Sequence, residues 1–91
     1  MFPRPGELIE VAPGRWRDPA LCSQQDLEAA QALAVEAARL GEDIAVMLAV
    51  AAERGLAVPD ELRERLSLGA RGLPATRRLH GELAAIVRAA E

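Results

Sequence analysis

The feature that most constrains this chain is the alanine-rich run between Ser23 and Gly55. Ser23 followed by Asp26 is a capping-box pattern, in which each side chain accepts a hydrogen bond from the other residue's backbone amide. Arg54 and Gly55 provide a helix stop, because a cation suits the last turn and glycine readily adopts the left-handed conformation beyond it. The run therefore predicts one long helix, or two helices joined near Gly41.

Apolar residues in this run recur every three or four positions, which is the helical period. They form an apolar stripe of Leu27, Ala30, Ala34, Ala37, Gly41, Ile44, Leu48 and Ala51, flanked by Leu33, Leu40 and Met47. We expect Gly41 to make a close helix contact within one continuous helix. A kink is the alternative, since glycine costs roughly 1 kcal/mol against alanine in a helix interior. Arg39 and Asp43 have the spacing of an ion pair on the polar face.

Residues 44–52 are apolar at every position, which breaks the amphipathic pattern of the first half of the run. A helix that is apolar all round is expected to be buried all round. The segment is too short to span a bilayer, which takes about 20 residues. We expect a second copy, a partner protein or the N-terminal arm to cover it. The alternative is that its small side chains are simply tolerated on the surface.

Residues 1–22 differ from the rest, because Pro3, Pro5, Pro13 and Pro19 exclude a helix there. The β-prone segment 7–11 precedes Pro13-Gly14, a dipeptide suited to a turn. In a helical chain such a strand has no evident partner, so we expect an extended arm that pairs with a second copy, adds to a partner's sheet or lies on the helices. Trp16 is either an anchor for a partner or a plug for the chain's own core.

Two further helices follow the long run. Pro59, Asp60 and Glu61 are typical of a helix start, and this helix should extend to about Leu68. Glycines at 69 and 72 separate it from a last helix that begins at Leu73-Pro74 and extends to about residue 90. The predicted fold is all-α: a long helical hairpin with a broken return arm, about three helices in residues 23–91, preceded by an extended proline-rich arm in residues 1–22.

The composition narrows the class of protein. The net charge is −3, which gives no general case for nucleic-acid binding. All 11 cations are arginine, which favours a bacterial or phage gene rich in G and C. A single cysteine makes neither an internal disulfide nor a zinc framework, and we identify no signal peptide. A cytoplasmic protein without membrane insertion is expected.

The sequence contains no pattern that predicts a catalytic, cofactor or metal site. His80 has no ligand partner at the helical spacings of three and four, so it is interpreted as a surface or boundary residue. Between residues 65 and 81 there are no acids, and this segment carries Arg65, Arg71, Arg77 and Arg78. Those arginines predict a site for an anion or an acidic partner. The alternative is a solvated surface balanced by nearby glutamates.

The leading functional hypothesis is a non-catalytic helical interaction protein: an adaptor, assembly subunit or chaperone-like partner in a larger bacterial or phage complex. The expected occupant of its surface is a protein partner or a second copy. The candidate partner-binding residues are Leu8, Ile9, Val11, Trp16, Ile44, Met47 and Leu48. One alternative is a small nucleic-acid-binding regulator that uses the segment from Arg65 to Arg78. A second alternative is a small dimeric helical enzyme.

Overall fold

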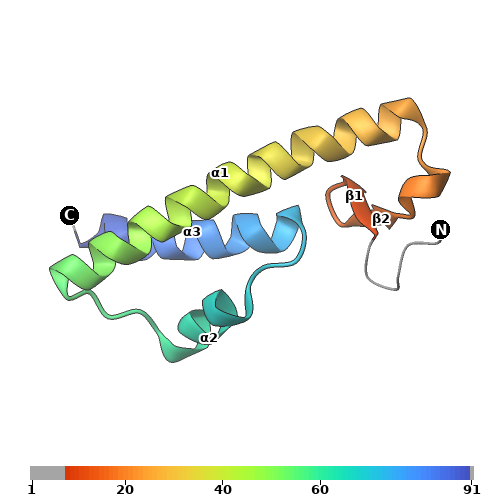
Figure 1. Cartoon of the computed structure of the whole chain (residues 1–91). Helices are drawn as coiled ribbons and strands as arrows, with labels where there is room; N and C mark the ends of the chain where they lie inside the picture. Colours follow the sequence, from red (N-terminus) through yellow and green to blue (C-terminus); the bar gives the residue numbers. More distant parts are fainter. Residues whose placement is uncertain (1–7, 91) are drawn as a thin grey trace.

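The computed structural model describes residues 8–90. Within them a two-stranded hairpin precedes three α-helices, so the chain is mostly helical, as the sequence predicts, with a small sheet that it does not (Figure 1). The elements are β1 (Ile9–Ala12), β2 (Arg15–Arg17), the 3-10 turn η1 (Pro19–Leu21), α1 (Gln24–Arg54), α2 (Asp60–Leu68) and α3 (Leu73–Ala89).

Helix α1 has the predicted ends. The Asp26 amide donates to Oγ of Ser23 at 3.1 Å, and the Ser23 amide donates to Oδ2 of Asp26 at 3.2 Å. Gly55 has a φ of 65°, and the amide of Leu56 donates to the carbonyl of Ala51 at 2.9 Å. Both ends are fixed by residues within a few positions, which is why the sequence predicts them well.

Helix α1 continues through Gly41, so the alternative of two helices joined there is wrong. The expected close contact is also wrong, because a Cβ placed on Gly41 would meet no atom within 4 Å. The stripe that faces the rest of the chain is rotated toward Leu33, Leu40 and Met47, which are half-buried. Leu27 and Leu48, expected at the centre of the stripe, are 41% and 36% exposed.

Helix α3 runs parallel to α1, not antiparallel to it. Arg77 binds Glu36 and, one turn later, His80 binds Asp43, so residue numbers rise together along the two helices. The predicted return arm is therefore wrong in direction: α2 makes the return, and the linker 69–72 turns the chain back again (Figure 1). Positive φ angles of 82° at Gly69 and 92° at Gly72 allow that second reversal. Asp43 is held by His80, so the expected pair with Arg39 is absent from the described chain.

The core lies where α3 meets the other two helices. Its buried apolar side chains are Ala51 of α1, Leu62 of α2, and Leu73, Leu79 and Leu83 of α3. Leu73 and Leu83 are completely buried. Helix α3 is thus the central element of the packing, although the alanine-rich run is longer.

The N-terminal strand finds its partner within the chain, contrary to the expectation of an extended arm. Antiparallel pairing joins Ile9 to Arg17, Glu10 to Trp16 and Ala12 to Arg15, with an irregularity between the last two pairs. Pro13-Gly14 makes the predicted turn, and Gly14 has a φ of 76°. The segment 7–11 is the predicted strand, but its partner β2 has only three residues and shows no strand pattern of its own. The hairpin packs against the first half of α1.

The molecule is long and thin, 48 × 22 × 16 Å. Its length matches the roughly 46 Å expected for the 31 residues of α1. Its radius of gyration is 15.7 Å, whereas a compact chain of this size has about 12 Å. A thickness of 16 Å leaves no room to surround α1, so this helix is covered on one side only.

The apolar segment 44–52 is therefore largely exposed. Only Ala51 is buried there, and Val46 is 62% exposed. The hairpin lies beside the other half of α1 (Figure 1), so the described part of the N-terminal arm does not cover the segment. Coverage by a second copy or by a partner protein remains a prediction.

Candidate protein-docking groove

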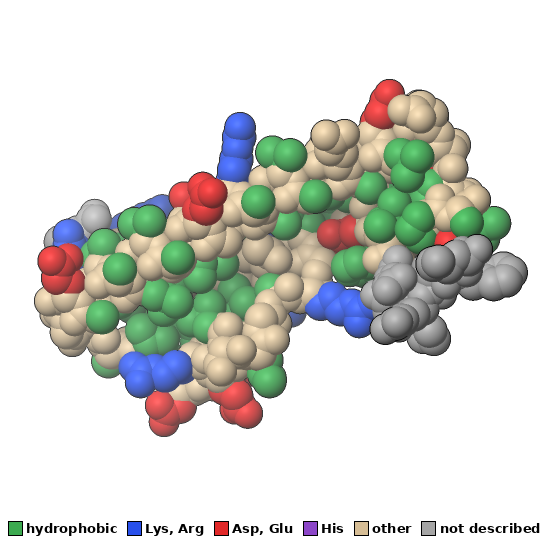
Figure 2. Space-filling model, in the orientation of Figure 1, with side chains coloured by type: hydrophobic (Ala, Val, Ile, Leu, Met, Phe, Trp, Pro, Cys, Tyr) green, Lys and Arg blue, Asp and Glu red, His purple; other side chains and the backbone are tan. Residues whose placement is uncertain are grey.

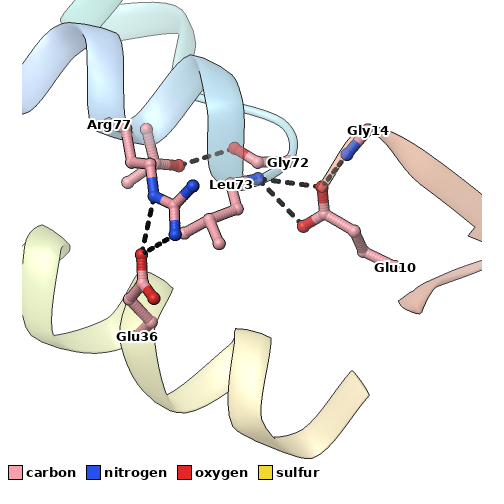
Figure 3. Close-up of polar contacts among 7 residues, drawn as sticks. Glu10, Gly14, Glu36, Gly72, Leu73 and Arg77 are labelled. Carbon is pink, nitrogen blue, oxygen red and sulfur yellow. Dashed lines mark hydrogen bonds and ion pairs between the residues drawn. The ribbon is translucent and has the colours of Figure 1, made fainter. Parts of the chain in front are cut away.

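The hairpin is attached to the helices by one carboxylate. The Leu73 amide, at the start of α3, donates to both oxygens of Glu10, at 2.9 and 3.0 Å. The Gly14 amide donates to Oε2 of the same carboxylate at 2.9 Å (Figure 3). Glu10 therefore fixes the turn of its own hairpin and also caps a helix 63 residues later. A carboxylate is well suited to this place, since the start of a helix presents unpaired amides and a partial positive charge.

The linker before α3 fits tightly against the hairpin. A Cβ on Gly72 would lie 3.1 Å from Oε2 of Glu10 and 3.1 Å from Cζ2 of Trp16. Arg71, the preceding residue, places its guanidinium 5.3 Å from the centroid of the Trp16 ring, within the range of a cation–π contact. The hairpin is therefore held as a fixed wall and not as a loose arm.

The first turn of α3 is also tied to α1. The Thr76 hydroxyl donates to the carbonyl of Gly72, the residue just before α3, at 2.9 Å. Arg77 donates through Nε to Oε2 of Glu36 at 2.8 Å, and Nη2 of Arg77 lies 2.7 Å from the same oxygen (Figure 3). These contacts and the Glu10 contacts hold the hairpin, α1 and the start of α3 in one arrangement.

Between these elements lies a groove of 420 Å³ along α1. Its floor consists of alanines of α1 together with Gln31 and Leu33. Its walls are Ile9 and Trp16 of the hairpin, and its far side is the linker and the first turn of α3. The lining residues are Ile9, Glu10, Trp16, Ala30, Gln31, Leu33, Ala34, Ala37, Ala70, Gly72 and Thr76. The lining is predominantly apolar. The carboxylate of Glu10 already accepts hydrogen bonds from the backbone amides of Gly14 and Leu73.

The groove continues toward the second half of α1. A second hollow of 390 Å³ shares Ala37, Ala70 and Thr76 with the first. It adds Gly41 and Ile44 of α1, Leu66 of α2 and Leu79 of α3. In Figure 2 green side chains lie between α1 and α2 and again beside the hairpin. We call the two hollows together the α1 groove.

The structure brings together some of the candidate partner-binding residues. Ile9, Trp16 and Ile44 line the α1 groove, and Trp16 remains 38% exposed. Val11 lies on the other side of the hairpin, in a hollow with Arg15, Arg17 and Asp26. Met47 is half-buried, and Leu8 and Leu48 are exposed outside the groove.

Sequence reasoning missed Glu10 and Gly72, which build the wall of the groove. Glu10 interrupts an apolar strand, and that is the one local pattern that could have marked it. Gly72 was interpreted only as a helix breaker. Their contact joins residues far apart in the sequence, so no spacing within either segment reveals it.

The arginines of the proposed anion site are divided between two places. Arg65, Arg71 and Arg78 line one hollow of 180 Å³, whereas Arg77 binds Glu36 on α1. Arg65 is paired with Glu82 at 2.9 Å, and this hydrogen-bonded carboxylate raises the pKa of Arg65 above its ordinary value. Two of the four cations are therefore already matched by acids within the chain.

Asp26, at the start of α1, also has a shifted pKa. The amide of Ser23 donates to Asp26, whose carboxylate also lies 3.0 Å from the guanidinium of Arg17. These two contacts lower the pKa of Asp26 below its ordinary value, although partial burial opposes the shift. The contacts of Asp26 with Ser23 and Arg17 join the hairpin to the start of α1, and they lie outside the groove.

The chemistry available in the groove is contact with apolar surface. Across residues 8–90 no cluster of three or more His, Cys, Asp or Glu side chains is placed to hold a metal ion. Over the same residues, no helix combines the length and the hydrophobicity that crossing a membrane requires. Comparison with protein-family models, curated proteins and solved structures found no match.

Proposed function

We propose that this chain is a non-catalytic interaction protein whose α1 groove receives an apolar helical segment of a protein partner. The observation that carries the proposal is the groove itself: an open, mainly apolar channel whose floor on α1 is mostly alanine and glycine, with a wall held in place by Glu10. Small floor residues let the backbone of a bound helix approach closely. Recognition of an amphipathic helix in such a groove is a common mode of peptide binding.

Trp16 supports the same proposal. Its ring contacts Gly72 and Arg71, lines the groove and is still 38% exposed. Tryptophan is enriched among the residues that contribute most to binding energy, and a ring that is already immobilised loses little entropy when it binds. We propose an adaptor, assembly subunit or chaperone-like partner in a cytoplasmic bacterial or phage complex.

Site-specific photocrosslinking in the source cell tests the groove. A photoreactive side chain replaces Ala34, an exposed floor residue, and a matched variant carries it at Arg63, an exposed position on α2. We expect a discrete adduct with one partner from position 34 and none from position 63. A further variant, Ala37→Glu, should abolish that adduct while circular dichroism shows an intact helical fold. Equal adducts from both positions, or adducts only with a second copy, would contradict the proposal.

The nucleic-acid alternative rests on the hollow lined by Arg65, Arg71 and Arg78. The ion pairs of Arg65 and Arg77 and the net charge of −3 weaken it. If phosphates were held there, log affinity would fall linearly with log salt concentration. Absence of binding to duplex and single-stranded probes at low salt would remove this alternative.

A further inference from the structure

A second surface of α1 has a regular pattern that the groove does not use. Eight residues spaced alternately by four and three lie on the side of α1 opposite its half-buried stripe. They are Glu28, Ala32, Val35, Arg39, Glu42, Val46, Ala49 and Glu53, and all eight are exposed. We call them the outer face. Val35 and Val46 on it are 50% and 62% exposed.

This four-three alternation is the spacing by which two α-helices pack side by side as a coiled coil. The outer face consists of two sets of residues that each repeat every seven positions: 28, 35, 42 and 49, and 32, 39, 46 and 53. In an antiparallel pair, a residue of one set lies opposite a residue of the other set on the second helix. With a twofold axis between Leu40 and Gly41, Val35 of one copy faces Val46 of the second copy. In the same register Ala32 faces Ala49, and Arg39 faces Glu42. Each of these contacts occurs twice.

We propose that the outer face is the interface of an antiparallel homodimer in this register. The proposal goes beyond the function assigned to the groove, because it concerns another side of α1 and does not depend on the groove. The occupant is a second copy because the central layers of the face match themselves in residue type and in charge. Valine faces valine, alanine faces alanine, and the cation faces the anion.

The charges select this arrangement against its competitors. A parallel pair in register would bring Arg39 against Arg39 and Glu42 against Glu42, and like charges in contact disfavour a pairing. A shift of one heptad would place Val35 against Arg39 and Val46 against Glu28. Within the described chain neither Arg39 nor Glu42 makes an ion pair, so both can bind across the axis.

The ends of the interface are less favourable. Glu28 and Glu53 face each other in this register, so two glutamate pairs repel at the outer layers. The central layers contain two valine pairs and two alanine pairs, a modest apolar area. We therefore expect a reversible dimer whose population rises with protein concentration, and not a permanent one.

Analytical ultracentrifugation of the full chain between about 1 μM and about 1 mM tests the register. We expect a monomer–dimer equilibrium for the unmodified protein. Arg39→Glu and Glu42→Arg should each weaken the dimer by about 10- to 30-fold, because each turns two attractive pairs into two repulsive ones. An equimolar mixture of the two variants should recover a heterodimer. In that mixture each glutamate at position 39 or 42 of one chain faces an arginine of the other chain.

Two controls separate this interface from general charge effects and from misfolding. Glu64→Arg makes the same charge change as Glu42→Arg at an exposed site on α2 and should leave the dimer unchanged. Val46→Glu should abolish the dimer while helicity stays constant, because the native side chain is already mostly exposed. Glu53→Arg should strengthen the dimer by about threefold to tenfold, since it converts the repulsive end layers into attractive ones.

Three results would overturn the proposal. One is a protein that remains monomeric across the whole concentration range. Another is a dimer that neither single charge reversal weakens, which would place the interface elsewhere. The third is loss of the dimer in both single variants without recovery on mixing, which would mean that Arg39 and Glu42 do not face each other. The groove experiment is unaffected by all three, so the two proposals can fail separately.

Discussion

The inner and outer faces of helix α1 both carry apolar side chains, but they differ in the size of those side chains, in charge and in environment. The inner face carries Leu33, Leu40 and Met47 and is half-buried against the rest of the chain. The outer face carries Val35 and Val46, which remain at least half exposed. The covered face therefore has the larger apolar side chains, whereas the outer face mixes valine and alanine with four charged residues. The path of the chain matches this pattern, because α2 and the linker 69–72 bring α3 back along one side of α1 only.

The difference also divides the roles of the two faces. The inner face is partly covered by the chain's own fold, and that covered part contributes to stability. The outer face and the α1 groove are left uncovered by that fold, so their apolar area contributes free energy only when another molecule binds. Substitutions on the inner side should thus change unfolding, and substitutions on the outer side should change association.

Leu83→Ala and Val46→Ala give the largest expected contrast. Leu83 of α3 is completely buried in the core, and truncating a buried leucine costs about 3 kcal/mol. Val46 is mostly exposed, so its truncation should change the free energy of unfolding by no more than about 0.5 kcal/mol. Urea unfolding followed by circular dichroism measures both, at a protein concentration too low for association. Equal losses for the two variants would mean that the outer face is covered within the monomer.

Glu10→Ala should be the next largest effect and tests what holds the inner side together. The change leaves the Leu73 amide without its partner at a part-buried helix start, a loss of about 2 kcal/mol. Glu64→Ala is the matched control, because Glu64 is exposed on α2. Trp16 fluorescence reports on the hairpin directly and should shift toward that of a solvated indole in Glu10→Ala alone. An unchanged spectrum and unchanged stability would mean that the hairpin does not depend on Glu10.

Ser23→Ala should lower the free energy of unfolding by less, since it removes only the N-terminal cap of α1 and no residue of either face. Loss of a serine cap costs about 1 kcal/mol. Gln25→Ala, in the exposed first turn, is the control and should change stability by no more than a few tenths of a kcal/mol. Thermal unfolding measures both variants. A loss confined to Ser23→Ala would show that the capping box is formed in solution.

Asp26 gives the same junction a dependence on pH. Its pKa is lower in the folded chain than in the unfolded chain, so the stabilisation is complete above the ordinary carboxyl pKa of 3.8. It is lost as the pH falls through the lower, native pKa. Asp26→Asn can keep the hydrogen bond from Ser23 but not the charge. The stability difference between the two proteins should be constant above about pH 5 and disappear in stronger acid. A difference that persists unchanged to about pH 2 would contradict the lowered pKa.

The sequence predicted those parts of the fold that depend on neighbouring residues. The ends of α1, the Pro13-Gly14 turn and the break between α2 and α3 are each decided within a few positions. The direction of α3 depends on two reversals and on which faces meet, so the predicted hairpin with a broken return arm is wrong. The role of Glu10 is likewise not predictable from neighbouring residues, since the amide that it binds lies 63 residues away. Ile9, Trp16 and Ile44 were chosen as apolar residues and do line the groove, whereas Val35 and Val46 were overlooked.

Gly41→Ala should give the smallest change and sharpens the boundary between the groove and the outer face. A Cβ at Gly41 meets no atom within 4 Å, and the same is true of Gly81 within α3. Each substitution should therefore stabilise the isolated chain by roughly 0.5–1 kcal/mol, through helix propensity alone. Gly41 also lines the α1 groove, whereas Gly81 is not among its lining residues.

The two variants should therefore differ only when the groove is occupied. Gly41→Ala adds a methyl group where a bound helix would approach α1, so it should reduce the photocrosslinked adduct formed from position 34. Gly81→Ala should leave that adduct unchanged. A loss of stability in Gly41→Ala, with a gain in Gly81→Ala, would show instead that α1 is bent or contacted at Gly41 in the free chain. The uninterrupted, open surface of α1 would then not exist in solution, and neither the groove nor the outer face could act as described.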